Sequence, residues 1–172
     1  RPPERSSIAW PRNAMRNLSA HLSDLPEVTG RPPWPAHEYV KGWGVFGLPF
    51  DSGHVLALRV FPENDFGSYV TLWHRTPSGE WSIHVDGARL DTACPRYYGA
   101  ACAYTGFAKI ALTWTGPLTL RVTVDAPALD WTLTVSSSPF LDLVNAISAV
   151  LPIATWKPRY LVRARELMGA YL

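Results

Sequence analysis

The sequence is poor in charged residues and contains no long hydrophobic segment. Charged side chains make up 17% of the 172 residues, and the formal net charge is +2. Nucleic-acid binding needs clustered lysine and arginine, so this small charge does not indicate it. The longest apolar run, at 146–154, contains Ser148 and Pro152 and is far shorter than the roughly 20 residues of a membrane-spanning helix. The hydrophobic fraction of 47% is typical of one ordinary globular domain.

Cysteines and the common catalytic motifs are also scarce. The two cysteines, Cys94 and Cys102, lie in the segment ACPRYYGAAC and do not have the spacing of a zinc site. A disulfide between them is one interpretation, and a pair of reduced side chains is the favoured one. The sequence has no glycine-rich phosphate loop and no G-x-S-x-G, H-E-x-x-H or C-x-x-C motif. We therefore expect a cytoplasmic protein with no metal and no cofactor, although a start at Arg1 rather than at methionine leaves room for an upstream segment.

Tryptophan and proline, by contrast, are abundant, with 8 and 16 residues. Tryptophan rings need an apolar environment and a partner for the N–H group, so this number indicates a large aromatic core or a ligand cavity. In residues 1–41 the prolines flank a short helical pattern at 11–25 and form a connector after it. We expect an N-terminal arm, a short helix and a proline-rich connector in this part of the chain.

Residues 42–137 carry the pattern of an antiparallel β domain. Apolar and polar side chains alternate with a period of two, and tight turns such as TPSG separate the runs. The expected strands lie at 54–61, 70–74, 81–85, 110–114, 118–124 and 131–135. Short strands in succession predict an antiparallel meander, and the threonine-rich outer face of the later strands suits a barrel or a strongly curved sheet.

Residues 138–172 have helical patterns. Ser138 is suited to cap a helix with Pro139 in its first turn, and residues 140–151 are apolar except for a narrow stripe, which predicts a mostly buried helix. A last helix at 159–172 carries the basic side chains Arg159, Arg163 and Arg165. Such a helix is usually a solvated surface, but it is also a candidate for contact with a membrane or a protein. We expect both helices to pack on the β domain.

Two histidines and an aspartate flank the turn in WHRTPSGEWSIHVDG, and the register of this hairpin decides whether they meet. A three-residue loop pairs Thr76 with Glu80, and His74, His84 and Asp86 then lie on one face of the sheet. Such a cluster would suit metal binding or acid–base chemistry.

A four-residue loop pairs Arg75 with Glu80 instead and moves His84 and Asp86 to the outer face, with His74 on the inner one. This register also collects the aliphatic side chains of both strands on one face. An aliphatic side chain left in water forfeits roughly 1.5–3 kcal/mol, whereas a cross-strand pair contributes at most about 1 kcal/mol. The sequence therefore predicts the four-residue loop, which separates His84 and Asp86 from His74.

His54 is the expected companion of His74. The strand at 54–61 also has its apolar face on even positions, so antiparallel pairing places the two rings next to each other, directly opposite or diagonally. Burial lowers the pKa of an imidazole and keeps it neutral, which is the state of a general base. His54 and His74 are therefore the candidate catalytic residues, and no third ligand is present to suggest a metal site.

Aromatic and apolar side chains near these histidines are the candidates for ligand binding. On the wall of the cavity we expect Trp81, Trp114 and Leu72, with Trp73 as a further aromatic candidate. The segment CPRYYG has the composition of a loop, and loops on a rigid sheet often carry recognition residues. At the rim of the cavity we expect Arg96, Tyr97 and Tyr98.

The order of a short helix, an antiparallel meander and a helical C-terminal segment resembles a lipocalin-like (calycin-type) barrel over about residues 42–172, with the helix-grip α+β fold as the alternative. The resemblance is architectural. The segment KGWGVFG at 41–47 does not match the glycine–tryptophan signature of lipocalins, and residues 1–10 do not supply the strand that a helix-grip fold begins with. No family membership follows from it, and fold alone does not determine function.

The leading functional hypothesis is a cofactor-independent enzyme of the isomerase, hydratase or cyclase type. It would act on a hydrophobic small molecule, with His54 or His74 as general acid or base. The first alternative is a non-catalytic carrier of a lipid or another hydrophobic ligand. The second alternative is an interaction module that docks through its basic C-terminal helix.

Overall fold

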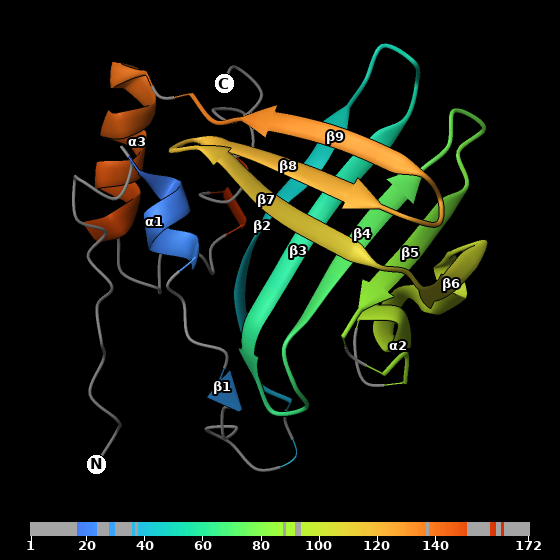
Figure 1. The fold of residues 1–172 in the computed structure, drawn as a ribbon. Helices are drawn as coiled ribbons and strands as arrows, with labels where there is room; N and C mark the ends of the chain where they lie inside the picture. The colour runs from blue at the N-terminus through green and yellow to red at the C-terminus, as the bar shows by residue number, and fades with distance from the viewer. Residues whose placement is uncertain are drawn as a thin grey trace. The chain divides into compact units, whose positions relative to one another are not determined.

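The computed structural model describes residues 17–23, 28–29, 36, 38–87, 89–91, 94–136, 138–150, 159–160 and 163. The chain divides into two compact units, one formed by Ser19–Thr134 and the other by Arg1–Leu18 with Val135–Leu172. The first unit contains all strands of the described residues, arranged in two sheets (Figure 1). It also contains the residues of the candidate site.

The first sheet is formed by β1 (Val28–Thr29), β2 (Val40–Pro49), β3 (Val55–Asn64), β4 (Tyr69–Arg75), β5 (Trp81–Asp86) and β6 (Tyr104–Phe107). The pairs β2–β3, β3–β4 and β4–β5 are antiparallel, so the predicted meander is confirmed for β3, β4 and β5. The pairs of β1 with β3 and of β6 with β5 are parallel, which the alternation pattern did not predict.

The connection from β5 to β6 contains α2 (Cys94–Tyr98) and the 3-10 turn η2 (Gly99–Ala101). A parallel pair requires such a crossover, because the chain must return to the same end of the sheet. The prediction that CPRYYG forms a loop is therefore wrong, because Cys94–Tyr98 is helical. Pro95 stands in the first turn of α2, where a missing N–H group costs nothing.

The second sheet is the antiparallel meander of β7 (Ile110–Gly116), β8 (Thr119–Val124) and β9 (Leu129–Thr134), as predicted. Its buried side chains Leu120, Val122 and Trp131 share a core with Leu58 and Leu72 of the first sheet. The two sheets thus form two layers (Figure 1). Within the described residues neither sheet closes on itself, so closure into a barrel is not confirmed, and the chain starts a separate sheet at β7.

The opposite face of the first sheet is also covered. Tyr69, Ile83 and Val85 form a second cluster with Cys94 of α2, and none of the four is more than 6% exposed. Strand β4 therefore has a core on both sides. Cys94 and Cys102 are both free, which agrees with the favoured interpretation of two reduced side chains.

Two further helices lie in the described residues, α1 (Leu18–Ser23) within the helix predicted at 11–25 and α3 (Pro139–Val150). The N–H of Leu141 donates to Ser138 Oγ at 3.2 Å, which confirms the predicted cap. The prediction that α3 is mostly buried is wrong. Its apolar residues lie on nearly all sides of the helix, and only one side of a helix can face a given surface. The exposed large apolar side chains of α3 are Phe140, Leu143, Ile147 and Val150. None of the described helices has the length and apolar character needed to cross a membrane.

Candidate functional site

The loop between β4 and β5 contains three residues rather than the predicted four. The N–H of Thr76 donates to Glu80 O at 2.9 Å, and the N–H of Gly79 donates to Thr76 O at 2.9 Å. Gly79 has a φ of 98°, a conformation that glycine adopts without strain. Strand β5 is therefore shifted by one residue from the predicted register, and His74 and His84 lie on the same face.

Burial on both faces of this hairpin explains the wrong register. The prediction assumed that one face of the sheet lies in water, where aliphatic side chains would forfeit burial energy. In the structure Leu72 packs in the core shared with the second sheet, while Ile83 and Val85 pack with α2 on the opposite face. The observed register therefore exposes no aliphatic side chain of these strands, and the geometry of the turn decides it.

Three histidines from neighbouring segments of the first sheet lie in a row. His54 precedes β3, His74 is in β4 and His84 is in β5. His54 Nδ1 lies 2.7 Å from His74 Nε2, and the two ring centroids are 5.0 Å apart with an angle of 18° between the ring planes. Val60 pairs with Val70, so the two rings are diagonal neighbours, one of the two predicted arrangements.

His84 is buried, and the hydrogen bonds of Ser82 favour one of its tautomers. The hydroxyl of Ser82 donates to the carbonyl oxygen of His74 at 3.3 Å, so its Oγ must accept the hydrogen bond from His84 Nε2 at 3.0 Å. Neutral His84 therefore carries its hydrogen on Nε2 and has a free lone pair on Nδ1. That nitrogen is buried and has no hydrogen-bond partner among the described residues.

Burial and mutual repulsion keep these rings neutral. Burial lowers the pKa of His84, and the nearby His74 lowers it further. Burial also lowers the pKa of His74, with a further contribution from His54. Both rings are thus held as neutral bases at near-neutral pH.

A pocket of about 360 Å³ lies beside the histidine row. Its lining residues are His74, Ser82, His84, Tyr104, Ala126 and Pro127. The Tyr104 ring lies 5.3 Å from the His84 ring, measured between centroids. A Cβ atom on Gly106 would overlap the Tyr104 phenol, so glycine at this position makes room for the phenol over β6.

Asp86, the third residue of the cluster considered from the sequence, has a structural role. Its Oδ2 accepts a hydrogen bond from the N–H of Ile110 at 2.8 Å and lies 3.3 Å from Nζ of Lys109. These contacts connect the end of β5 to the start of β7. Asp86 shares the face of the histidines but is not among the residues that line the pocket.

The structure separates the predicted ligand-binding residues from the histidines. Leu72 is a core residue that is 1% exposed, and Trp114 packs against Trp43, with ring centroids 6.2 Å apart. Trp81 and Tyr98 line a different pocket with Trp73, on the face of the first sheet that α2 covers. The single cavity expected from the sequence is therefore replaced by two pockets on opposite faces of the first sheet.

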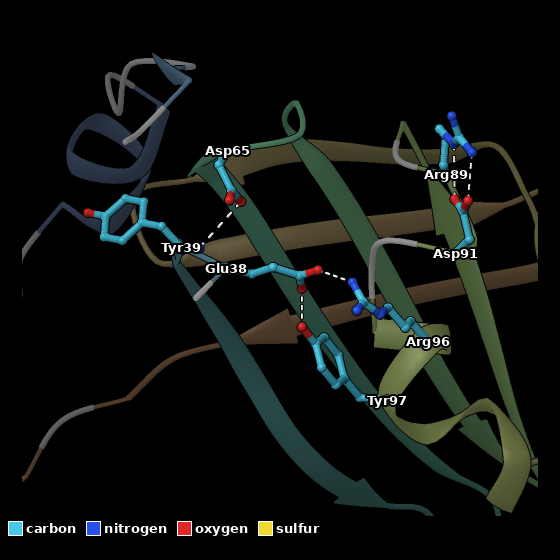
Figure 2. A network of polar contacts seen from close by, with 7 residues as sticks. All are labelled: Glu38, Tyr39, Asp65, Arg89, Asp91, Arg96 and Tyr97. Carbon is cyan, nitrogen blue, oxygen red and sulfur yellow. Dashed lines mark hydrogen bonds and ion pairs between the residues drawn. The ribbon is translucent and has the colours of Figure 1, made fainter. Parts of the chain in front are cut away.

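Arg96 and Tyr97 of α2 are engaged in a polar network at the surface. The guanidinium of Arg96 and the hydroxyl of Tyr97 both donate to the carboxylate of Glu38, which lies between them (Figure 2). The N–H of Tyr39 donates to Asp65 at 3.3 Å nearby. Arg96 and Tyr97 therefore hold α2 to the segment before β2, and neither lines either of these two pockets.

No metal centre is found in the described part of the chain, where no three histidine, cysteine, aspartate or glutamate side chains are grouped so that they could hold an ion. Comparisons with family models, with curated proteins and with solved structures find no match to this chain. The chemistry of the site is therefore inferred from its own geometry.

Ser82, His84 and Tyr104 line the pocket but were not among the predicted site residues. The sequence signal for the first two was the glycine of the PSG loop, which suits a type I turn followed by a glycine bulge and so shifts β5 by one residue. No local signal marks Tyr104, because β6 joins the sheet in parallel after a helical connection.

The buried, neutral His84 predicts a pH dependence of stability. Its pKa is about 6.5 in the unfolded chain and lower in the folded protein, so the unfolded state binds the proton first as pH falls. The stability that neutral His84 contributes is present above about pH 6.5 and is lost as pH falls through the folded-state pKa. Urea denaturation between about pH 5 and pH 7 should show this loss in the wild type and a smaller loss in His84→Gln. Equal pH dependence in both proteins would contradict the burial of this ring.

Proposed function

We propose that the protein is a cofactor-independent enzyme that moves protons on a hydrophobic small molecule bound in the pocket beside the histidine row. The observation that supports it most strongly is the 2.7 Å contact between His54 and His74, of which His74 lines the pocket. Imidazoles exchange protons near neutral pH, and a hydrogen-bonded pair accepts a proton at one end while releasing another at the far end.

The pair offers a path for the proton. With the shared hydrogen on His74 Nε2, the Nδ1 atom of His74 has a lone pair that accepts a proton from the substrate. The Nε2 hydrogen then moves to His54 Nδ1, and the hydrogen on His54 Nε2 leaves to solvent. Both rings end neutral, so no positive charge has to be held in a half-buried site. The reverse movement returns a proton to another atom of the substrate.

The walls of the pocket favour a substrate with an apolar body and few polar atoms. Ala126, Pro127 and the ring of Tyr104 are apolar surfaces, whereas Ser82 and His84 add polar atoms. Isomerisation, hydration and cyclisation suit such a site, because positioning and one proton transfer supply most of the rate. A closed barrel is not required for this function, since the pocket lies between β6 and the turn that follows β8.

Elimination of 5-nitrobenzisoxazole tests the proposal, because a base that removes one carbon-bound proton opens the ring and no other group is needed. The wild type should accelerate the reaction above solution, and the rate should rise with pH to a plateau. The midpoint should lie below about 6.5, because burial and His54 lower the pKa of His74. No acceleration over the same protein unfolded in urea, or a midpoint above that of a free imidazole, would contradict a buried histidine base.

A non-catalytic carrier is the first alternative. The buried Nδ1 of His84 without a partner supports it, since a hydroxyl or amide of a bound ligand would satisfy this acceptor. A carrier would bind hydrophobic alcohols in this pocket and release them unchanged, with no acceleration of the elimination.

An interaction module that docks through the basic C-terminal helix is the second alternative. Arg159 and Arg163 are exposed helical residues, while Arg165 lies outside the described residues. Exposed basic side chains of a helix suit contact with an anionic membrane or a protein. Deletion of residues 158–172 would then abolish association without affecting small-molecule binding.

A further inference from the structure

A second pocket, of about 530 Å³, lies on the face of the first sheet that is opposite to the histidine row. Its walls include the rings of Phe46, Trp73, Trp81 and Tyr98. Trp73 contacts two of these rings edge to face, with centroid distances of 6.5 Å to Trp81 and 5.3 Å to Tyr98. Such an aromatic lining favours a flat apolar ligand.

The charged residue in this lining is Arg59 of β3. Its guanidinium lies 5.1 Å from the centroid of Phe46 and 5.0 Å from that of Trp73. Its Nε is buried without a hydrogen-bond partner, and none of the ion pairs among the described residues includes it. A guanidinium that is stacked on rings keeps its N–H donors available, because they lie in its own plane.

We propose that this pocket binds an aromatic carboxylate. The carboxylate would pair with the donors of Arg59, and the ring would pack against Trp73, Trp81 and Tyr98. A carboxylate matches the edge of a guanidinium with two parallel hydrogen bonds and supplies an anionic partner that Arg59 does not have among the described residues. One cation in an otherwise apolar lining favours a single negative charge over a dianionic phosphate, because a second buried charge would be left without a partner.

The polar network of α2 engages the carboxylate of Glu38 away from Arg59. Glu38 is already bound by Arg96 and Tyr97 (Figure 2). These contacts fix α2, which also carries Tyr98, a residue of the pocket wall. The carboxylate of Glu38 is thus used to hold α2 and forms no ion pair with Arg59.

Isothermal titration with 2-naphthoate, 2-naphthylmethanol and phenyl phosphate tests the proposal. The wild type should bind 2-naphthoate more tightly than the neutral alcohol. Arg59→Met, which has an apolar side chain of similar length, should weaken the binding of 2-naphthoate by about tenfold or more and leave the binding of the alcohol unchanged. Arg59→Lys keeps the charge and loses the planar edge, so its affinity for 2-naphthoate should lie between those of the wild type and Arg59→Met.

Matched variants separate the effect of this site from others. Arg121→Met removes an arginine whose partner is Asp130 of the second sheet and should leave binding of 2-naphthoate unchanged. His74→Gln should also leave it unchanged, and Arg59→Met should leave the elimination of 5-nitrobenzisoxazole unchanged, so this proposal and the proposed function fail independently. Urea denaturation checks the fold of each variant. If Arg59→Met does not fold, Tyr98→Ala serves in its place, because Tyr98 is half-exposed and its loss should weaken the binding of 2-naphthoate by removing one ring of the pocket wall.

Three results would overturn the proposal. The first is no binding of 2-naphthoate to the wild type, and the second is equal binding of 2-naphthoate and its alcohol. The third is tighter binding of phenyl phosphate than of 2-naphthoate, which would assign the pocket to a phosphate ligand.

Discussion

Replacing His74 by glutamine is expected to lower the rate of proton abstraction from 5-nitrobenzisoxazole by about a hundredfold or more, the usual contribution of a general base. Glutamine has a similar size and retains hydrogen-bonding atoms toward His54, so the pocket and the fold should persist. It cannot accept a proton near neutral pH, and His74 is the member of the His54–His74 pair that lines the pocket. The loss of activity is measured from initial rates at a pH on the plateau of the pH–rate profile, normalised to the fraction of folded protein.

Two further variants define what the loss means. His21→Gln changes a histidine of α1 that does not line the pocket and should leave the rate unchanged. His54→Gln should lower the rate less than His74→Gln and should raise the midpoint of the pH profile, because His54 contributes to the lowered pKa of His74. Full activity in His74→Gln would contradict the assignment of this residue as the base.

Replacing Leu72 by alanine is expected to destabilise the fold by about 2–5 kcal/mol, the usual range for a large apolar side chain removed from a packed core. Leu72 is 1% exposed and belongs to the core that both sheets share. Because it does not line the pocket, the rate of the elimination per folded molecule should stay the same. Urea denaturation and the normalised rate are the two measurements.

Leu143→Ala is the matched control for this prediction. Leu143 is an exposed residue of α3, so its loss should change the free energy of unfolding by no more than about 0.5 kcal/mol. If Leu72→Ala kept full stability and lost the activity, Leu72 would be a ligand-binding residue, as the sequence alone suggested.

The parts of the fold that follow from local patterns could be predicted from the sequence. Alternation with a period of two located β3, β4, β5 and the three strands of the second sheet. Ser138 followed by Pro139 marked the start of α3 to the residue. The pairing of His54 with His74 was also predictable, because both lie on even positions of antiparallel neighbours.

The parts that depend on what covers each face could not be predicted. The alternation does not reveal that α2 packs on the outer face of the first sheet, and burial therefore favoured the wrong register for β5. That error moved His84 out of the site and placed Trp81 in it. Closure of the sheet was inferred from the polar face of the later strands, but their hydrogen bonds form a separate sheet.

The titration of the His84 ring by NMR, in the wild type and in His74→Gln, tests the central claim that the histidines form one row on one face. We expect a wild-type pKa below about 6.5, because the ring is buried and His74 lies near it. In His74→Gln the pKa should rise, since the contribution of that neighbour is removed, while burial still holds it below 6.5. An unshifted pKa in the wild type that does not respond to the substitution would place His84 on a solvated face and contradict the account.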